Sequence, residues 1–297
     1  MGQKSQVLNP KSKIQMKLLV DSGSTKADWI ALDDNGNKLF TTQSLGLNPE
    51  VLDKKEVLER LEDRFDIYQN RKAVTHLFFY GAGCGTDRMK NFLADIFKEF
   101  FTNAEIVVKE DTYAAAYATN PNNDKAIISI LGTGSNCSYF DGVELHQKIQ
   151  SLGYMAMDDC SGNRFGRSLI RAYHFGKMPA HLAEEFEKEY DLDPDVIKHH
   201  LYKEPNPNAY LATFAKFLIK HKDDVFINVF VRKAMQKFVD NYITQFENCR
   251  EIPVHFVGSI AFYLRDELKT VLEQNGLILG NVLRRPIDGL SDYHRLN

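Results

Sequence analysis

Two turns rich in glycine and hydroxyl-bearing residues, each directly after an apolar run, place the strongest constraint on what this chain can fold into. The first is Asp21–Lys26, with the sequence DSGSTK, and the second is Gly132–Asn136, with the sequence GTGSN. A turn that wraps an anionic group at close range needs small side chains, and its N–H groups and hydroxyls supply the donors. Two such turns, with the acidic residue Asp111 between them in the chain, predict two cradles for phosphate.

The composition is that of an ordinary globular protein with room for two lobes. Of its 297 residues, 43% are hydrophobic and 26% are charged, so the chain can bury a sizeable core. The formal net charge is -3, and Lys and Arg are interspersed with acids instead of forming a basic stripe, so we expect no nucleic-acid partner. No apolar run approaches the length of a membrane span, so we expect no membrane partner either.

The cysteines indicate a reducing compartment, and we expect a cytoplasmic protein. They lie far apart, without the paired spacing of a disulfide framework or a zinc site. They are Cys84, Cys137, Cys160 and Cys249. Residues 1–15 are polar and basic with no apolar core, which excludes a signal peptide and predicts a flexible N-terminal extension.

The first half of the chain has the pattern of a mixed sheet flanked by helices. Three short apolar runs predict a β-meander, and helix-period and strand-period runs then alternate. The predicted strands are Met16–Val20, Ala27–Leu32, Lys38–Thr42, Thr75–Tyr80 and Glu105–Val108, and the predicted helices are Glu50–Phe65, Arg88–Phe101 and Thr112–Ala118. This order is typical of an α/β domain.

The second half repeats the theme of a strand, a glycine-hydroxyl turn and a hairpin. The predicted strands are Lys125–Leu131, Cys137–Phe140, Val143–Ile149, Pro253–Val257 and Leu277–Val282. Helical patterns fill Arg164–Asn248 and Ala261–Glu273. We therefore predict a duplicated α/β domain with a central cleft, an N-terminal lobe over 16–119, and a C-terminal lobe over 120–297 that carries a helical insertion at about 163–250.

The order of these motifs resembles a known superfamily. The chain runs through Asp21–Lys26, Asp111, Leu131–Asn136, Leu152–Tyr154 and Val257–Ser259. This order is similar to that of the sugar-kinase branch of the actin/hexokinase/Hsp70 superfamily, and more narrowly to N-acetylglucosamine kinases of the BadF/BadG/BcrA/BcrD ATPase family. The resemblance covers nearly the whole chain. It implies duplicated ribonuclease H-like (actin-like ATPase) domains, ATP and Mg²⁺ as cofactors, phosphorylation of the 6-hydroxyl of N-acetylglucosamine or a related amino sugar, and a homodimer.

The resemblance gives the first turn a role in holding the phosphates. Asp21 would hold Mg²⁺ through water, and Ser24, Thr25 and Lys26 would lie near the β- and γ-phosphates. The chemistry agrees, because a hard cation that retains several waters is commonly bound through one or two carboxylates. The alternative is a tight hairpin in which the aspartate only caps the turn.

The second turn would be shared between nucleotide and sugar. On the resemblance, Gly132, Thr133 and Gly134 contact the nucleotide, whereas Ser135 and Asn136 reach toward the sugar. The alternative is a plain serine-rich β-turn.

Two further glycine segments follow strands. Gly258 and Ser259 resemble the adenosine motif, although a simple strand-to-helix turn would have the same sequence. Gly81–Gly85 contains G-x-G-x-G but lacks the rest of a dinucleotide fingerprint and the Lys-Ser/Thr of a P-loop, so we interpret it as a turn from a strand into the cleft.

Asp111 is the predicted catalytic base. It follows a strand and precedes a helix, where its carboxylate can accept a proton from a sugar hydroxyl during phosphoryl transfer. The alternative is a helix N-cap. On the resemblance, Asn48 and Gly153 would bind sugar, although Asn48 before Pro49 is also an ordinary turn former.

The segment Met157–Gly162 departs from the family pattern Gly-Asp-Glu-Gly-Ser-Gly. Asp158 remains where the family would hold sugar hydroxyls, but Met157 and Cys160 bring side chains where the family has glycine, and Asp159 replaces glutamate. We expect these changes to reshape the pocket or its backbone. They leave a non-catalytic sugar sensor as an alternative to a kinase. A dehydratase-activator ATPase is a third candidate, against which the scattered cysteines argue.

Overall fold

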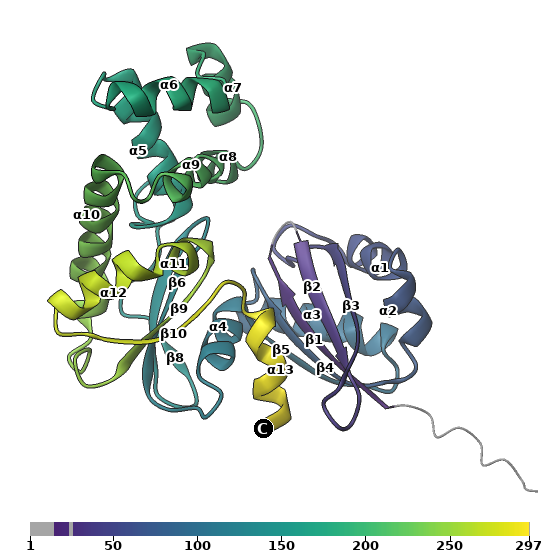
Figure 1. Cartoon of the computed structure of the whole chain (residues 1–297). Helices are drawn as coiled ribbons and strands as arrows, with labels where there is room; N and C mark the ends of the chain where they lie inside the picture. Colours follow the sequence, from purple (N-terminus) through teal and green to yellow (C-terminus); the bar gives the residue numbers. More distant parts are fainter. Residues whose placement is uncertain (1–14, 24–25, 297) are drawn as a thin grey trace, which may run out of the picture. The chain divides into compact units, whose positions relative to one another are not determined.

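The computed structural model describes residues 15–23 and 26–296, so most of the predicted N-terminal extension lies outside the described residues. The chain forms two compact units, each built on its own sheet (Figure 1). One unit runs through Ala114 and takes in the chain from Leu290 onward, and the other is Ala115–Gly289. The division falls within helices α4 (Asp111–Thr119) and α13 (Ile287–Leu296), so the C-terminal residues that the sequence assigned to the second lobe return to the first unit.

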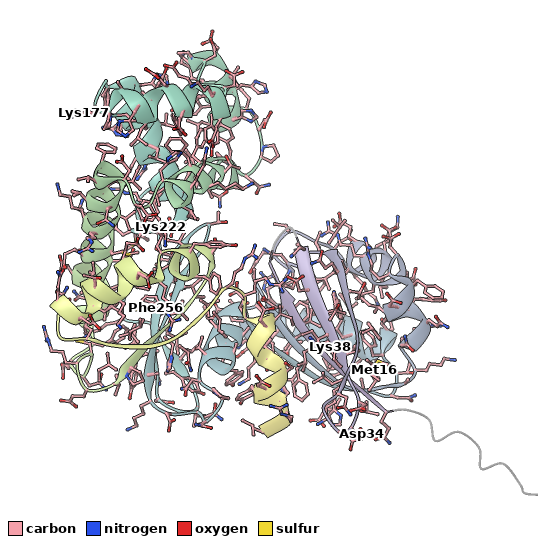
Figure 2. All side chains as sticks on the ribbon, viewed as in Figure 1. Met16, Asp34, Lys38, Lys177, Lys222 and Phe256 are labelled. Carbon is pink, nitrogen blue, oxygen red and sulfur yellow. The ribbon has the colours of Figure 1, made fainter. Side chains whose placement is uncertain are left out.

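The first unit contains a five-stranded mixed sheet in the order β3-β2-β1-β4-β5. Its strands are β1 (Met16–Ser22), β2 (Lys26–Leu32), β3 (Lys38–Leu45), β4 (Val74–Gly81) and β5 (Glu105–Glu110). The first three form the predicted antiparallel meander, and β4 and β5 run parallel to β1. Leu18, Val20 and Trp29 belong to the core of this unit, and Met16 marks the start of β1 (Figure 2).

The helices of the first unit are α1 (Lys54–Glu62), α2 (Phe65–Asn70) and α3 (Asp87–Phe100). The helix predicted over Glu50–Phe65 begins only at Lys54 and ends at Glu62, and a second helix starts at Phe65. The Asp53 side chain accepts the backbone N–H of Glu56, whose own side chain accepts the N–H of Asp53. This reciprocal cap begins α1 at Lys54.

The C-terminal half of α13 covers the face of the first sheet that carries the side chains of Phe78 and Tyr80. The rings of Phe78 and His294 lie 4.1 Å apart between centroids, and the Tyr80 hydroxyl is hydrogen-bonded to His294 Nε2 at 2.9 Å. Burial lowers the pKa of His294 to about 4, so this histidine is neutral at pH 7.

The second unit repeats the topology of the first, in the order β10-β9-β6-β7-β8. Its strands are β6 (Ala126–Leu131), β7 (Ser135–Phe140), β8 (Leu145–His146), β9 (Pro253–Val257) and β10 (Ile278–Leu283). Again three strands form an antiparallel meander, and the last two run parallel to the first. Two sheets with one strand order confirm the predicted duplication, whereas the predicted cleft between the halves stays a prediction.

The strand predicted over Val143–Ile149 is only two residues long. The Asp141 carboxylate accepts the backbone N–H groups of Val143 and Glu144, which shapes the turn before β8. Beyond this turn, only Leu145 and His146 pair with β7.

Helices fill most of the chain between β8 and β9, as predicted. They are α5 (Gly162–His174), α6 (Ala180–Glu189), α7 (Pro194–Tyr202), α8 (Pro207–Thr213), α9 (Ala215–Lys220), α10 (Val225–Asn241) and the 3₁₀ turn η1 (Ile243–Gln245). After β9 come α11 (Ser259–Tyr263) and α12 (Arg265–Gln274). Phe256 on β9 belongs to the core that these helices share with the sheet (Figure 2). Among the described residues, no helix is long and apolar enough to cross a membrane.

The buried side chain of His255 accepts a backbone hydrogen bond where the pairing between β9 and β10 is irregular. The β9–β10 register shifts between Leu279 and Val282, and the backbone N–H of Asn281 there donates to His255 Nδ1 at 2.8 Å. Gly280 allows this approach, since a Cβ at that position would lie 2.4 Å from His255 Nδ1. Only the neutral ring can accept this bond. Burial lowers the pKa of His255 to about 4.

We predict that the second unit loses stability between pH 6.5 and pH 4 through His255. In this window the unfolded histidine binds a proton and the folded one does not, so stability is complete above pH 6.5 and falls with pH. The loss is about 3 kcal/mol from this residue. His255→Asn should flatten the pH dependence of chemical unfolding in this window, and His174→Asn, at an exposed histidine, should not. Equal pH dependence in His255→Asn and the unchanged protein would contradict this account.

Candidate functional site

In the first unit, three parallel strands bring predicted site residues to one edge of the sheet. β1 ends at Ser22, β4 at Gly81 and β5 at Glu110, and the carboxyl ends of parallel strands are where open α/β sheets bind ligands. Asp21 and Asp111 therefore lie at this edge. So does the Gly81–Gly85 turn, whose Ala82 N–H donates to the carbonyl of Ser22.

Asp111 is the first residue of α4 and is partly buried. Burial, together with the neighbouring Glu110 carboxylate, raises the pKa of Asp111 to about 6, and a hydrogen bond with the backbone N–H of Thr112 opposes that rise. Asp111 thus lies at a helix start, and its pKa is close to neutral, while its role as the catalytic base stays a prediction. A carboxylate with such a pKa can accept a proton near physiological pH.

Asn48 lies next to the glycine-rich turn in the same unit. Its side chain packs against Gly83, and its Oδ1 accepts the backbone N–H of Glu50 at 2.9 Å. The turn-forming role weighed for Asn48 is therefore present in the structure. Its predicted contact with sugar stays a prediction.

The first predicted phosphate turn is described only at its two ends. Ser24 and Thr25 lie outside the described residues. Asp21 pairs in register with Asp28 of β2, and the Lys26 ammonium lies 3.0 Å from Asp28 Oδ2. Two carboxylates on directly opposed residues favour a cation nearby, so the residues present fit a hard divalent ion held through Asp21.

In the second unit, the turn at Gly132–Gly134 is hydrogen-bonded to the start of α5, whereas Ser135 and Asn136, predicted as part of this turn, are the first residues of β7. The backbone N–H of Gly162 donates to the carbonyl of Gly132 at 2.8 Å, and the Asn163 backbone N–H and side-chain amide both donate to the carbonyl of Thr133. The turn closes on itself through a bond from Gly132 N–H to the carbonyl of Gly134. These bonds hold the turn against the N-terminus of α5.

The structure also brings Asp158 to this turn. A Cβ on Gly134 would lie 2.8 Å from Asp158 Oδ2, which accepts the side-chain amide of Asn163 at 2.9 Å. Asp158 is only 7% exposed. Cys160 has φ near +60°, a conformation that glycine favours, and its side chain belongs to the core and does not line the cavity described below. The reshaping expected from the sequence stays a prediction.

Gly258 lies directly against the same turn. It has φ +122°, and a Cβ there would lie 2.2 Å from the carbonyl oxygen of Leu131 and 3.0 Å from Gly132 N. Its N–H donates to the carbonyl of Leu283. Only glycine fits this position, so the predicted adenosine motif and the second phosphate turn are neighbours in space.

A cavity of about 420 Å³ joins these segments within the second unit. Gly132, Thr133 and Ser259, all predicted from the sequence, line it. The rest of its lining comes from the helical segment, α11 and the residue after β10, and includes Gly162, Ala212, Ala215, Lys216, Ile219, Ile260, Tyr263 and Arg284. An apolar cavity with glycine turns and cationic side chains can hold a nucleotide.

Sequence reasoning missed Lys216, Tyr263 and Arg284. The Arg284 guanidinium lies 5.5 Å from the centroid of the Tyr263 ring, within the range of a cation–π contact. These three side chains come from separate elements and belong to no motif. The available signal was the basic pair Arg284-Arg285 directly after the last strand.

The remaining predicted sugar contacts are less closely grouped. Ser135 Oγ is buried and has no hydrogen-bond partner in the described part of the chain, and Asn136 Oδ1 accepts the side-chain amide of Gln147 at 2.9 Å. Gly153, with φ +78°, lies in an exposed loop and does not line the cavity. The backbone N–H of Leu152 in that loop donates to Met157 Sδ at 3.2 Å.

Comparison with known proteins identifies the family. The model of the BadF/BadG/BcrA/BcrD ATPase family matches residues 20–286. The chain belongs to this family. A solved structure of a candidate N-acetylglucosamine kinase from Porphyromonas gingivalis is 34% identical, with a TM-score of 0.87, and the match covers 95% of this chain and 99% of that one. The resemblance seen in the sequence is therefore confirmed, as is the duplicated actin-like ATPase fold.

More distant solved structures share the fold alone. A candidate N-acetylglucosamine kinase from Chromobacterium violaceum is 18% identical with a TM-score of 0.69, over 96% of this chain and 100% of that one. A ROK family glucokinase from Streptomyces griseus, solved with glucose and AMPPNP, is 14% identical with a TM-score of 0.56, over 95% and 97% of the two chains. No curated protein sequence matches this chain significantly.

We predict that alanine lowers the stability of the second unit at Gly258 but not at the neighbouring Gly132. Gly258→Ala should destabilise the second unit by about 2 kcal/mol or more, because it adds strain at φ +122° to a clash with Leu131. Gly132→Ala should leave stability unchanged, since no atom lies within 4 Å of its Cβ position, but should weaken nucleotide binding if a phosphate or sugar occupies that space. Chemical unfolding and ATP titration separate the two effects. Equal unfolding midpoints for both variants would contradict the packing argument.

Proposed function

We propose that this chain is an ATP-dependent kinase that phosphorylates the 6-hydroxyl of N-acetylglucosamine or a closely related amino sugar. The observation that carries the proposal is the likeness to the Porphyromonas gingivalis candidate kinase over nearly the full length of both chains. Membership of an ATPase family supports ATP as the donor. The cavity beside Gly132 and Ser259 supports a nucleotide site in the second unit.

In the proposed reaction, Asp111 takes the proton of the 6-hydroxyl as that oxygen attacks the γ-phosphorus. The bond between the γ-phosphorus and the β,γ-bridging oxygen breaks, and ADP leaves. Lys26 and the Gly132–Gly134 turn hold the phosphates, and Asp21 would hold Mg²⁺. When bound, that ion neutralises charge on the transferred group. The pKa of Asp111, about 6, leaves it mostly ionised at pH 7, as a base must be.

We propose that the polar side chains of Asn48, Ser135, Asn136 and Asp158, and the backbone of Gly153, bind the sugar. Asn48 belongs to the first unit, and Ser135, Asn136, Gly153 and Asp158 belong to the second. Fixed amide, hydroxyl and carboxylate groups discriminate between sugars because a wrong hydroxyl leaves a buried group unpaired. The buried Asp158 carboxylate, held by Asn163, is suited to this task.

A non-catalytic sugar sensor is the second candidate, favoured by the altered segment Met157–Cys160. The buried side chain of Cys160 weakens that case, because it packs in the core while the backbone of Gly162 and Asn163, directly after the segment, bonds to the Gly132 and Thr133 carbonyls. A dehydratase activator is disfavoured because the four cysteines are all buried and cannot share an iron–sulfur cluster at a surface. The homodimer implied by the family stays a prediction.

The proposal is tested with a coupled assay for ADP formation over a panel of amino sugars and neutral hexoses. We expect N-acetylglucosamine or a near analogue to stimulate ADP formation, with the phosphate found on oxygen 6. Binding of sugar and ATP in calorimetry without any phosphorylated product would favour the sensor. No stimulation and no binding by any sugar would overturn both.

Asp111→Asn should lower kcat by roughly 10²–10⁴-fold, because the amide cannot accept the proton. Affinity for ATP, measured by calorimetry, should stay near that of the unchanged protein, since the proposed contact of Asp111 is with the acceptor. A variant that keeps full turnover would show that Asp111 serves only as a helix cap.

We predict that kcat/KM falls below about pH 6 as Asp111 becomes protonated, by about tenfold per pH unit. Glu110→Gln should move this acid limb to lower pH, because the neighbouring negative charge is one cause of the raised pKa. Glu105→Gln, at the exposed start of β5, is the matched control and should leave the limb in place. An acid limb that does not respond to Glu110→Gln would assign it to another group.

A further inference from the structure

Lys26, the last residue of the first turn, forms an ion pair with the buried carboxylate of Asp28. Lys26 Nζ lies 3.0 Å from Asp28 Oδ2, with the lysine side chain 49% exposed. Asp28 is only 9% exposed. Sequence reasoning gave Asp28 no role, although it lies two residues beyond Lys26 on the same strand. In a strand, residues two apart point to the same face of the sheet, which brings the two side chains together.

Asp28 is itself fixed from the next strand. Gln43 pairs in register with Asp28 between β2 and β3, and its side-chain amide donates to Asp28 Oδ1 at 2.7 Å. One carboxylate oxygen is therefore bound by Gln43 and the other by Lys26. A carboxylate held at both oxygens offers the ammonium one defined position.

On its other side, Asp28 of β2 pairs in register with Asp21 of β1. Like charges on directly opposed residues repel, and the Lys26 ammonium offsets the charge of Asp28. A lysine side chain loses up to about 2 kcal/mol of rotamer entropy when it is immobilised. An ammonium that is already fixed at the turn reduces that cost when an anion binds.

We propose that Asp28, supported by Gln43, is a positioning residue that holds the Lys26 ammonium ready for the β- and γ-phosphates of the nucleotide. This inference rests on the ATP site of the proposed function but not on its sugar. An ammonium has three donors, so Lys26 can bond Asp28 and phosphate oxygens together. Asp28 contacts no phosphate itself in this arrangement.

The experiment measures binding of ATP, ADP and adenosine, each with Mg²⁺ and without sugar, by calorimetry. Asp28→Asn and Lys26→Met should each weaken ATP about tenfold or more and leave adenosine unchanged. ADP should be weakened by an intermediate amount. On this proposal Asp28 affects ATP affinity through Lys26, so the double variant should lose no more ATP affinity than Lys26→Met alone.

Two controls separate positioning from folding. Glu99→Gln removes an exposed ion pair with Lys54 in the same unit and should leave all three affinities unchanged. If Asp28→Asn does not fold, Gln43→Ala loosens the same carboxylate from the neighbouring strand and should weaken ATP and spare adenosine. Thermal unfolding of each variant shows whether a loss of affinity has a structural origin.

Three results would overturn the inference. Asp28→Asn could bind ATP as the unchanged protein does, it could bind ATP more tightly because Asp28 competes with phosphate for Lys26, or it could lose adenosine and ATP equally. Failure of the proposed function has another signature. In that case no sugar stimulates ADP formation, while the pattern of nucleotide affinities across these variants stands.

Discussion

The close approach of Gly258 to the Leu131–Gly132 backbone is the contact on which the second unit's cavity depends. β6 and β9 are neighbouring parallel strands, so the turns that follow them emerge side by side. At Gly258 even a Cβ would overlap the Leu131 carbonyl, whereas a Cβ at Gly132 would point into open space. Because these backbones touch, Gly132, Thr133 and Ser259 line one cavity together, and Lys216 and Arg284 add cationic side chains to its lining.

The repeated topology explains why polar residues gather at the ends of strands in both units. Each sheet has a meander followed by two strands parallel to its first strand, so each has one edge where several carboxyl ends meet. In the first unit that edge carries acids, Asp21 and Asp111, and in the second it carries glycine turns. One fold thus supplies a carboxylate-rich edge and a main-chain-rich edge. Phosphoryl transfer uses both kinds of group.

Much of the fold could be predicted because local signals and tertiary packing agree. The turn at Gly132–Gly134 and the hairpin that joins β7 to β8 follow from short-range backbone chemistry, so a single sequence is enough to place them, whereas Ser24 and Thr25 of the first turn lie outside the described residues. Arg284 and Tyr263, in contrast, meet at the cavity only because α11 and the end of β10 pack together. The Asp28 pair needs the strand register, and the Asp111 pKa needs burial, neither of which a linear pattern contains. The return of the C-terminal residues to the first unit likewise leaves no sequence signal.

The altered segment Met157–Cys160 places the side chains of Met157 and Cys160 in different surroundings. Cys160 keeps a backbone conformation that costs an ordinary residue about 1 kcal/mol, and its buried side chain offsets that cost within the core. Met157 does something different, because its sulfur accepts the N–H of Leu152 and so restrains the exposed loop that carries Gly153. The change at position 160 therefore bears on the packing of the second unit, whereas the change at position 157 bears on the exposed loop that leads into the segment.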